Sequence, residues 1–214
     1  MPERGPEAFP ARRGSGLVYW KRTAIVEFSD EELCRRVAQR EADAFELLLK
    51  RYQARAFRLA YSMLGNEADA RDLSQDAFIR VYETAHQFDG RSRFATWFHR
   101  VLVNLCIDHQ RRGKWWQKVT TLWQSDDESE ARQPPEPESP DPGPEAEAIR
   151  TQDVSRLETA LARLSPKQRA AVLLQAHEGL SSREIADVLK CSDNTARVHL
   201  HRGLAELRKL MKEN

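Results

Sequence analysis

The 214-residue chain has only three cysteines, and they stand far apart in the sequence. An odd number of scattered cysteines gives neither a disulfide framework nor the spacing of a metal site. Free cysteine is otherwise among the most frequently buried residue types. We therefore interpret Cys34, Cys106 and Cys191 as small apolar residues of a core.

Long apolar runs are absent as well. Although 40% of the residues are hydrophobic, no segment approaches the roughly 18 uncharged apolar residues that a membrane-spanning helix needs. The N-terminal segment also lacks the continuous apolar stretch of a secretion signal. We therefore expect a soluble, cytoplasmic protein that does not insert into a membrane and that buries one or two modest cores.

Residue arrangements typical of enzymes are missing too. The sequence has no P-loop, no Ser/His/Asp or Cys/His set and no paired carboxylates. The histidines at 86, 99, 109 and 177 share no predicted face, and those at 199 and 201 point from divergent faces of one helix. The sequence therefore predicts no catalysis, no bound metal and no cofactor.

Charge is distributed unevenly, although the net charge is only +1. Residues 1–28 carry +2, residues 29–124 carry +3, residues 125–149 carry −8 and residues 150–214 carry +4. The acidic stretch contains six prolines and almost no apolar side chain, so it cannot form a packed core. We predict two basic globular domains, 29–118 and 150–214, joined by a flexible acidic linker over 119–149.

Residues 1–28 combine prolines, glycines and arginines without a sustained helical period. This composition is typical of disorder. We predict a disordered basic extension, and a basic arm that touches nucleic acid is the alternative interpretation.

The first predicted domain shows helical periodicity. Apolar residues follow a 3.6-residue repeat from Phe45 to Met63. Gly65 is placed to end that helix and Asn66 to cap the next one. Ser92 can cap a further helix after a loop. With a short helix near the start of the domain, the prediction is four α-helices.

The third of these helices carries a polar stripe. Asp72, Gln75, Asp76 and Arg80 stand at i, i+3, i+4 and i+8, so they share one face. Such a stripe suits docking on a partner helix through charged hydrogen bonds. The alternative is a solvated surface with an internal Asp76–Arg80 pair.

The second domain shows the pattern of a helix-turn-helix. Ser165-Pro166 begins one helix, with proline at the first helical position. Ser181 and Glu184 form a capping box at the start of a second. A three-residue turn at 190–192 leads to a long last helix. Apolar residues recur on its inner face at Ala196, Leu200, Leu204, Leu207 and Met211.

The outer face of the last helix is basic and rich in hydrogen-bonding groups. Its members are Asn194, Thr195, Arg197, His199, His201 and Arg202. Such groups reach base edges and phosphates when a helix lies in the major groove of DNA. A solvated helix surface is the alternative for any single residue, but the combination of cap, turn and basic face favours DNA binding.

Both domains carry motifs of one known family. The first contains Glu67-Ala68-Asp69-Ala70-Arg71-Asp72-Leu73 and Phe88-Asp89-Gly90, and the second contains Glu178-Gly179-Leu180-Ser181 and Glu184-Ile185-Ala186. In this order and spacing, over about residues 30–118 and 150–212, the sequence resembles the extracytoplasmic-function (ECF) subgroup of the bacterial sigma-70 family. These are the smallest sigma factors, which keep only the second and fourth conserved regions.

One segment departs from the family pattern. The family commonly has Gly-Thr-Val-Lys/Arg-Ser-Arg at the start of its recognition helix, whereas this chain has Asn194-Thr195-Ala196-Arg197-Val198-His199. The resemblance therefore leaves the upstream promoter sequence open.

The resemblance implies a function for each domain. Region 2, at 29–118, would bind core RNA polymerase and the melted -10 element, with the polar stripe on the clamp coiled coil of the largest subunit. Region 4, at 150–214, would bind the polymerase flap and read the duplex -35 element through the basic face of its last helix. The residues expected at the -10 strand are Phe88, Asp89, Arg91, Arg93, Arg100, Asn104, Arg111, Arg112 and Lys114.

Some aromatic residues keep two interpretations. Phe88 either stacks on or walls a base pocket, or packs in the core. Trp97 is interpreted as core. Trp115 and Trp116 either stack on bases or close the end of their helix.

The resemblance also implies partners. These are core RNA polymerase, promoter DNA and an anti-sigma factor that masks the same surfaces, with a membrane-anchored anti-sigma factor as one form, in a stress or envelope response. The alternative function is a stand-alone helix-turn-helix regulator whose N-terminal domain senses a ligand or dimerises. The polar stripe and the Phe88/Asn104 block argue against it.

Overall fold

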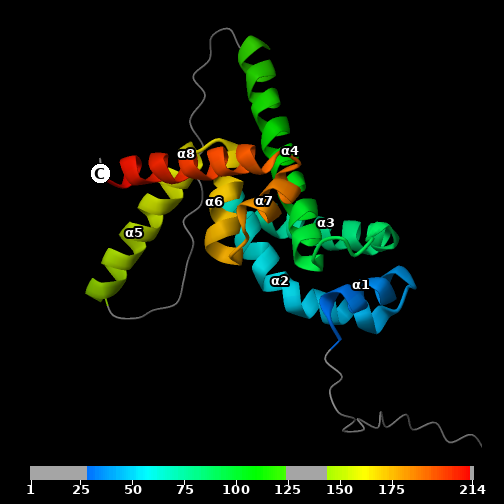
Figure 1. Cartoon of the computed structure of the whole chain (residues 1–214). Coiled ribbons are helices and arrows are strands. Elements are labelled where there is room, and N and C mark those ends of the chain that lie inside the picture. The colour runs from blue at the N-terminus through cyan, green and yellow to red at the C-terminus, as the bar shows by residue number, and fades with distance from the viewer. Residues whose placement is uncertain (1–27, 124–143, 213–214) are drawn as a thin grey trace, which may run out of the picture.

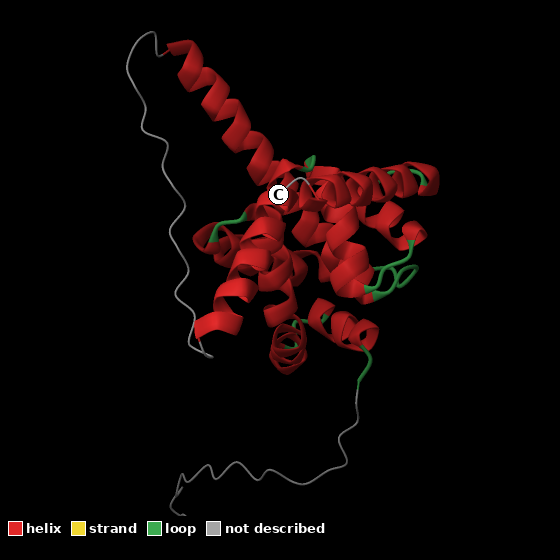
Figure 2. Cartoon of the chain, turned by 90° about the vertical axis from the view of Figure 1, so that its left-hand side faces the viewer, coloured by secondary structure: helices red, strands yellow, loops and turns green. Residues whose placement is uncertain are grey.

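The computed structural model describes residues 28–123 and 144–212, and side chains over 28–113 and 154–212. The described chain is helical and without strands, which confirms the all-α prediction (Figures 1 and 2). The helices are α1 (Asp30–Ala38), α2 (Ala42–Leu64), α3 (Glu67–Thr84), a 3₁₀ turn (Ala85–Gln87), α4 (Phe94–Trp123), α5 (Pro144–Arg163), α6 (Pro166–Glu178), α7 (Ser182–Leu189) and α8 (Asp193–Lys212).

Most helix ends lie where the capping residues place them. Asn66 Oδ1 accepts the amide of Asp69 at 2.9 Å, and Gly65 ends α2 in the left-handed conformation at φ +70°. The expected capping box forms at the start of α7, and Ser165, the expected cap of α6, forms a second box with Gln168. Lys190 ends α7 at φ +50°, a conformation that costs a non-glycine residue modest strain.

The start of α4 differs from the prediction. Ser92 is not its cap, because the helix begins at Phe94 and the Phe94 amide donates to Glu31 Oε1 of α1 at 2.9 Å. A carboxylate from another helix therefore satisfies a free amide that the local sequence assigned to a serine.

The first domain packs α1 to α4 around a core rich in aromatic rings. The Phe98 ring lies 5.2 Å from that of Tyr52 and 5.1 Å from that of Phe78, centroid to centroid. Cys34 and Cys106 are fully buried, as expected. Burial raises the pKa of the Cys34 thiol to about 11 and that of Cys106 to about 12, so both stay protonated and inert.

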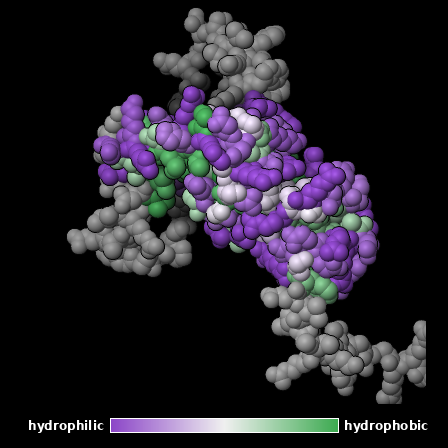
Figure 3. Space-filling view, in the orientation of Figure 1, coloured by the Kyte–Doolittle hydropathy of each residue, from purple (hydrophilic) through white to green (hydrophobic). Residues whose placement is uncertain are grey.

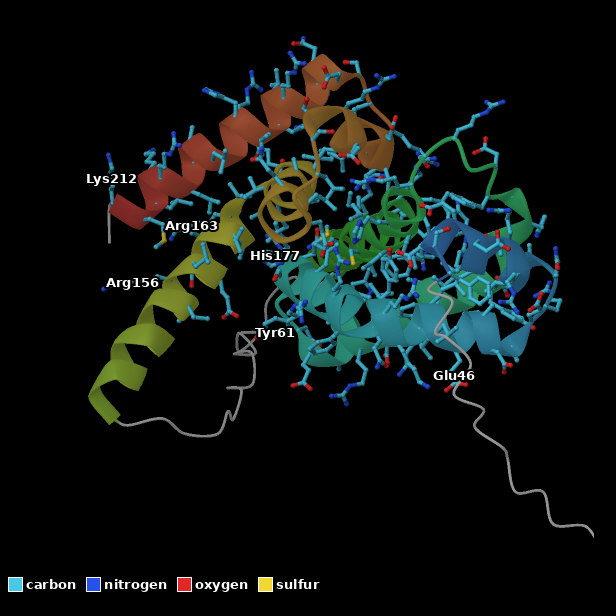
Figure 4. All side chains as sticks on the ribbon, turned by 60° about the horizontal axis from the view of Figure 1, so that its bottom comes forward. Glu46, Tyr61, Arg156, Arg163, His177 and Lys212 are labelled. Atoms are coloured by element: carbon cyan, nitrogen blue, oxygen red, sulfur yellow. The ribbon has the colours of Figure 1, made fainter. Side chains whose placement is uncertain are left out.

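The second domain packs α6, α7 and the inner face of α8 together, while α5 projects from the body and carries Arg156 further out than Arg163 (Figure 4). One expected core residue is wrong: Met211 is 43% exposed, and Leu210 is buried. Val154 and Leu157 on α5 are also exposed, and apolar surface gathers where α5 and α8 meet (Figure 3).

The two domains are in direct contact rather than held apart. Helix α7 packs against α4, and α6 packs against α2. The carbonyl of Met63, in the last turn of α2, accepts hydrogen bonds from Gln110 of α4 and Arg169 of α6. Arg55 of α2 donates to Glu178 of α6, whose side chain is only 4% exposed. Hydrogen bonds and an ion pair therefore connect one domain to the other.

The predicted linker is described only at its ends. Helix α4 runs to Trp123 and α5 begins at Pro144, so both enter the stretch 119–149. Residues 124–143 and the predicted extension, apart from Phe28, lie outside the described residues. Within the described part of the chain, no helix is long and apolar enough to cross a membrane.

Candidate nucleic-acid interface

The polar stripe lies on the exposed side of α3. Asp72, Gln75, Asp76 and Arg80 are all exposed, and the described side chains include no Asp76–Arg80 ion pair. The charges of the stripe are therefore open to a partner.

An apolar residue lies within the same stripe. Ile79 is 56% exposed, one turn along α3 from Gln75 and Asp76. Ile79 was not among the predicted stripe residues, although its spacing of i+4 from Gln75 and i+3 from Asp76 places it on their face. Ile79 therefore adds an exposed apolar group to the charged stripe.

A cavity of about 480 Å³ opens between α3, α4 and the turn of the helix-turn-helix. It brings Asp76 and Arg80 of the stripe together with Arg100 and Asn104 of α4. Lys190, from the second domain, lines the same cavity. Residues predicted for polymerase docking and for the -10 strand thus meet at one place, with the helix-turn-helix at its edge.

Two aromatic residues near this cavity differ in whether they line it, and Trp97 does not lie where it was expected. Trp97 lines the cavity, whereas Phe88 is absent from its lining. The Phe88 ring packs 5.5 Å from Trp97 and 6.1 Å from Phe94, centroid to centroid. The structure therefore presents Trp97 to the cavity and places Phe88 behind it as support.

The loop before α4 is held by its own side chains. Asp89 Oδ1 accepts the Arg91 amide at 3.0 Å, and Gly90 between them has φ +72°. The Arg91 guanidinium is exposed and 3.3 Å from Asp89. Arg93 instead turns to the second domain, where its Nε donates to Glu184 Oε1 at 3.1 Å. Of the two loop arginines, Arg93 is therefore held by the second domain, whereas Arg91 pairs only with Asp89 of its own loop.

The basic residues further along α4 remain accessible. Arg111 and Arg112 are exposed, and Arg111 lies 3.8 Å from Asp108. Lys114, Trp115 and Trp116 belong to the same helix, but their side chains lie outside the described ones.

The outer face of α8 matches the predicted basic face except at one residue. Asn194, Thr195, Arg197, His201 and Arg202 are exposed. Thr195 also helps to start the helix, since its amide donates to Ser192 Oγ at 3.1 Å. Arg197 pairs with Asp193 at 2.6 Å and is 3.4 Å from Ser182 Oγ.

His199 is the exception, because it is half-buried. Burial lowers its pKa, and so do the nearby charges of Lys167 on α6 and Arg202. The ring is therefore neutral and lies at the margin of the face. Two further residues that our sequence analysis missed belong near this surface: Lys167, which is close to His199, and Val198, which is exposed on the face itself.

Neither histidine of α8 belongs to a metal site. Over the described residues, no group of three or more His, Cys, Asp or Glu side chains could hold a metal ion. The outer face of α8 therefore carries cationic, amide and imidazole side chains.

Comparison with known proteins matches each of the two domains to a protein family. Residues 48–116 match the family model described as Sigma-70 region 2, and residues 155–207 match Sigma-70, region 4. The chain is 36% identical over 166 residues to the ECF RNA polymerase sigma factor SigE of Mycolicibacterium smegmatis, covering 77% of this chain and 60% of that relative. It is 30% identical over 171 residues to the RNA polymerase sigma factor CarQ of Myxococcus xanthus, covering 80% and 91%.

A solved structure shares the fold. It is the sigma factor RpoE in complex with the anti-sigma factor NepR from Bartonella quintana, with a TM-score of 0.57 and 23% identity. The similarity covers 78% of this chain and 96% of the RpoE chain.

Proposed function

The chain belongs to the ECF group of sigma-70 RNA polymerase sigma factors, and from this premise we propose how its two domains recruit polymerase to a promoter. The first domain binds core polymerase and captures the melted -10 strand. The second reads the -35 element as duplex. The observation that carries the proposal is the presence, on one chain, of an exposed recognition face on α8 and of a cavity that joins Asn104 to the docking stripe.

The -35 element is read by the outer face of α8. The exposed side chains of Asn194, Arg197 and Arg202 suit base edges and phosphates in the major groove. Each bidentate arginine or asparagine contact with the correct base contributes about 1–3 kcal/mol of discrimination. His199, half-buried and neutral, has at most a supporting role.

The -10 element is read as a single strand at the α3/α4 cavity. Extruding a base costs a few kcal/mol, which stacking and hydrogen bonds to the base edge must offset. Trp97 offers a ring, Asn104 an amide, and Arg100 and Arg112 charges for phosphates, all on the lining of one cavity.

The two domains must separate before both elements are read. The centres of the -35 and -10 elements are about 25 base pairs apart, which is about 85 Å along straight duplex at 3.4 Å per base pair. In the arrangement described here Arg93 and Glu184 touch, and Lys190 lies at the -10 cavity. Binding to polymerase and promoter therefore pulls α7 away from α4.

Protein partners have two separate surfaces. The stripe on α3, together with the exposed Ile79 beside Arg80, docks on the clamp coiled coil of the largest polymerase subunit. The exposed apolar residues Val154, Leu157 and Met211 give the second domain a surface for the polymerase flap. Because the structurally similar RpoE was solved with an anti-sigma factor, we include an anti-sigma factor among the partners that compete for these surfaces.

The test assigns one promoter element to each domain. Arg197→Ala and Asn104→Ala are compared by in vitro transcription with core polymerase, on promoters mutated separately at each element. Arg197→Ala should lose activity by an amount that depends on the upstream sequence. Asn104→Ala should respond to the downstream bases, and it should keep part of its defect on a template whose bubble is opened by mismatches, since the cavity is still needed there.

If both variants respond to the same element, the division between domains is wrong. Tight, sequence-specific binding of duplex by the chain without polymerase would instead favour a stand-alone regulator. Gel shifts with and without core enzyme distinguish these outcomes.

A further inference from the structure

One residue at the centre of the recognition face is apolar. Val198 is 38% exposed on α8, one turn from Asn194 on one side and from His201 and Arg202 on the other. We propose that Val198 is a specificity-determining residue that contacts the C5-methyl group of a thymine in the -35 element. This inference rests on the proposed function, since it requires α8 to lie in the major groove.

The position of Val198 follows from the helix geometry. Residues advance by about 100° along an α-helix, so Val198 faces away from the buried side, which is formed by Ala196, Gly203 and Leu207. The neighbouring Arg197 is tied to Asp193 at 2.6 Å and approaches Ser182 at 3.4 Å, so its guanidinium is directed towards α7. The valine is thereby left open between the longer polar side chains.

Packing does not account for a valine here. Val198 is exposed, and a β-branched residue is a poorer helix former than alanine. Its neighbours on the face are polar, so it does not belong to a contiguous apolar patch that a protein would cover. The major groove offers one apolar group among its base edges, the thymine methyl, and short apolar side chains contact it. The chemistry of the face therefore selects thymine beside Val198.

The experiment removes the methyl from the DNA and from the protein separately. A promoter is first selected with the wild-type holoenzyme from a library randomised over the upstream element. Each thymine of the selected element, on either strand, is then replaced singly by deoxyuridine, which lacks only the C5-methyl. Promoter binding by holoenzyme is measured for the wild type and for Val198→Ala, in which the better helix former keeps α8 intact.

One deoxyuridine substitution should weaken binding by the wild type about threefold to fivefold, the loss expected for one methyl-sized apolar contact. Val198→Ala, whose shorter side chain contacts the methyl less, should weaken binding on the unmodified promoter and should lose less than the wild type at that deoxyuridine. Deoxyuridine placed outside the element is the matched control and should leave promoter binding by both proteins unchanged.

Equal effects of every deoxyuridine on both proteins would overturn the proposal, and so would a selected element without thymine. In both cases an upstream element would still have been selected, so the proposed function of the second domain as a reader of that element would remain supported. If the library yields no upstream preference at all, the proposed function of the second domain fails instead.

Discussion

The imidazole of His99 is buried where the two domains meet. Its Nε2 lies 3.4 Å from Glu178 Oε2, and Glu178 is also paired with Arg55. Burial lowers the pKa of His99 to about 4, the nearby Arg55 lowers it as well, and Glu178 acts in the opposite direction. The effect of burial on the pKa is larger than that of Glu178. His99 is therefore neutral in the folded protein at neutral pH and does not form a charged pair with Glu178.

This pKa predicts a stability that depends on pH. In the unfolded chain His99 binds a proton below its ordinary pKa of about 6.5. In the folded chain it binds one only when the pH falls to about 4. The free energy of unfolding should therefore fall as the pH drops through this window, by about 2 kcal/mol at this residue between pH 7 and pH 5. Urea unfolding of wild type and His99→Leu at both pH values measures it.

Between pH 7 and pH 5, the free energy of unfolding of His99→Leu should fall by about 2 kcal/mol less than that of the wild type. His177→Leu removes an exposed histidine and is the control that should behave like the wild type. An equal loss in all three proteins would show that His99 takes up its proton in the folded state.

The stripe on α3 gives a second prediction for a single residue. Asp76→Arg inverts an exposed charge beside Ile79 and keeps a good helix former, so the protein should fold. Retention of core polymerase on the immobilised chain should fall at least tenfold. Glu46→Arg, on the outer surface of α2, is the matched charge reversal and should retain polymerase normally (Figure 4). Equal retention by both variants would remove α3 from the docking surface.

At the scale of elements, the contact of α8 with α6 depends on a glycine. A Cβ added at Gly203 would lie 2.8 Å from Val172 Cγ2 and 3.2 Å from the Gln168 carbonyl oxygen. Both distances are too short, and the second involves backbone that cannot move alone. Gly203 therefore lets the recognition helix approach α6 closely, and the series of large apolar residues on α8 gave no sign of this.

Gly203→Ala should consequently destabilise the protein. Alanine in place of a helical glycine gains about 1 kcal/mol in propensity, whereas overpacking a core costs about 1–3 kcal/mol. We expect a net loss of about 1 kcal/mol by urea unfolding. Gly113→Ala on α4 has open space around the new methyl and should gain stability. Equal stability of the two variants would show that Val172 and α6 move aside without cost.

At the scale of the whole molecule, the ion pairs between domains hold the closed arrangement. Arg55 is half-exposed, but Glu178 is not, so removing Arg55 leaves a buried carboxylate without its cation. Such a loss is strongly destabilising for a buried pair, and here it acts on the contact between domains.

Separation of the domains can be followed by energy transfer between dyes. The exposed Glu83 on α3 and Glu206 on α8 are replaced by cysteine in a Cys191→Ser background, since the other two cysteines are buried. Transfer should be high in the free chain, lower in Arg55→Met and lowest in the complex with polymerase and promoter. Arg58→Met, an exposed neighbour on α2, should match the wild type. Unchanged transfer in the promoter complex would contradict the opening that our proposal requires.

The sequence by itself determined that the chain is helical and where most of the capped helix ends lie. The caps at Asn66, Ser165 and Ser181 and the turn at Lys190 depend on groups within a few residues of one another, so a local reading predicts them. The family motifs placed the helix-turn-helix and the stripe on α3 for the same reason, because each lies within one or two consecutive helices.

Only the tertiary structure decided how the domains meet and which side chains reach the cavity. The partner of Arg93 is 91 residues away along the chain, and that of Arg55 is 123 residues away. Helical periodicity carries no information across such separations, so the prediction of two domains joined by a flexible linker did not reveal that the domains pack together. The same lack of local signal explains why Trp97 faces the cavity while Phe88 supports it, and why a carboxylate from α1 starts α4.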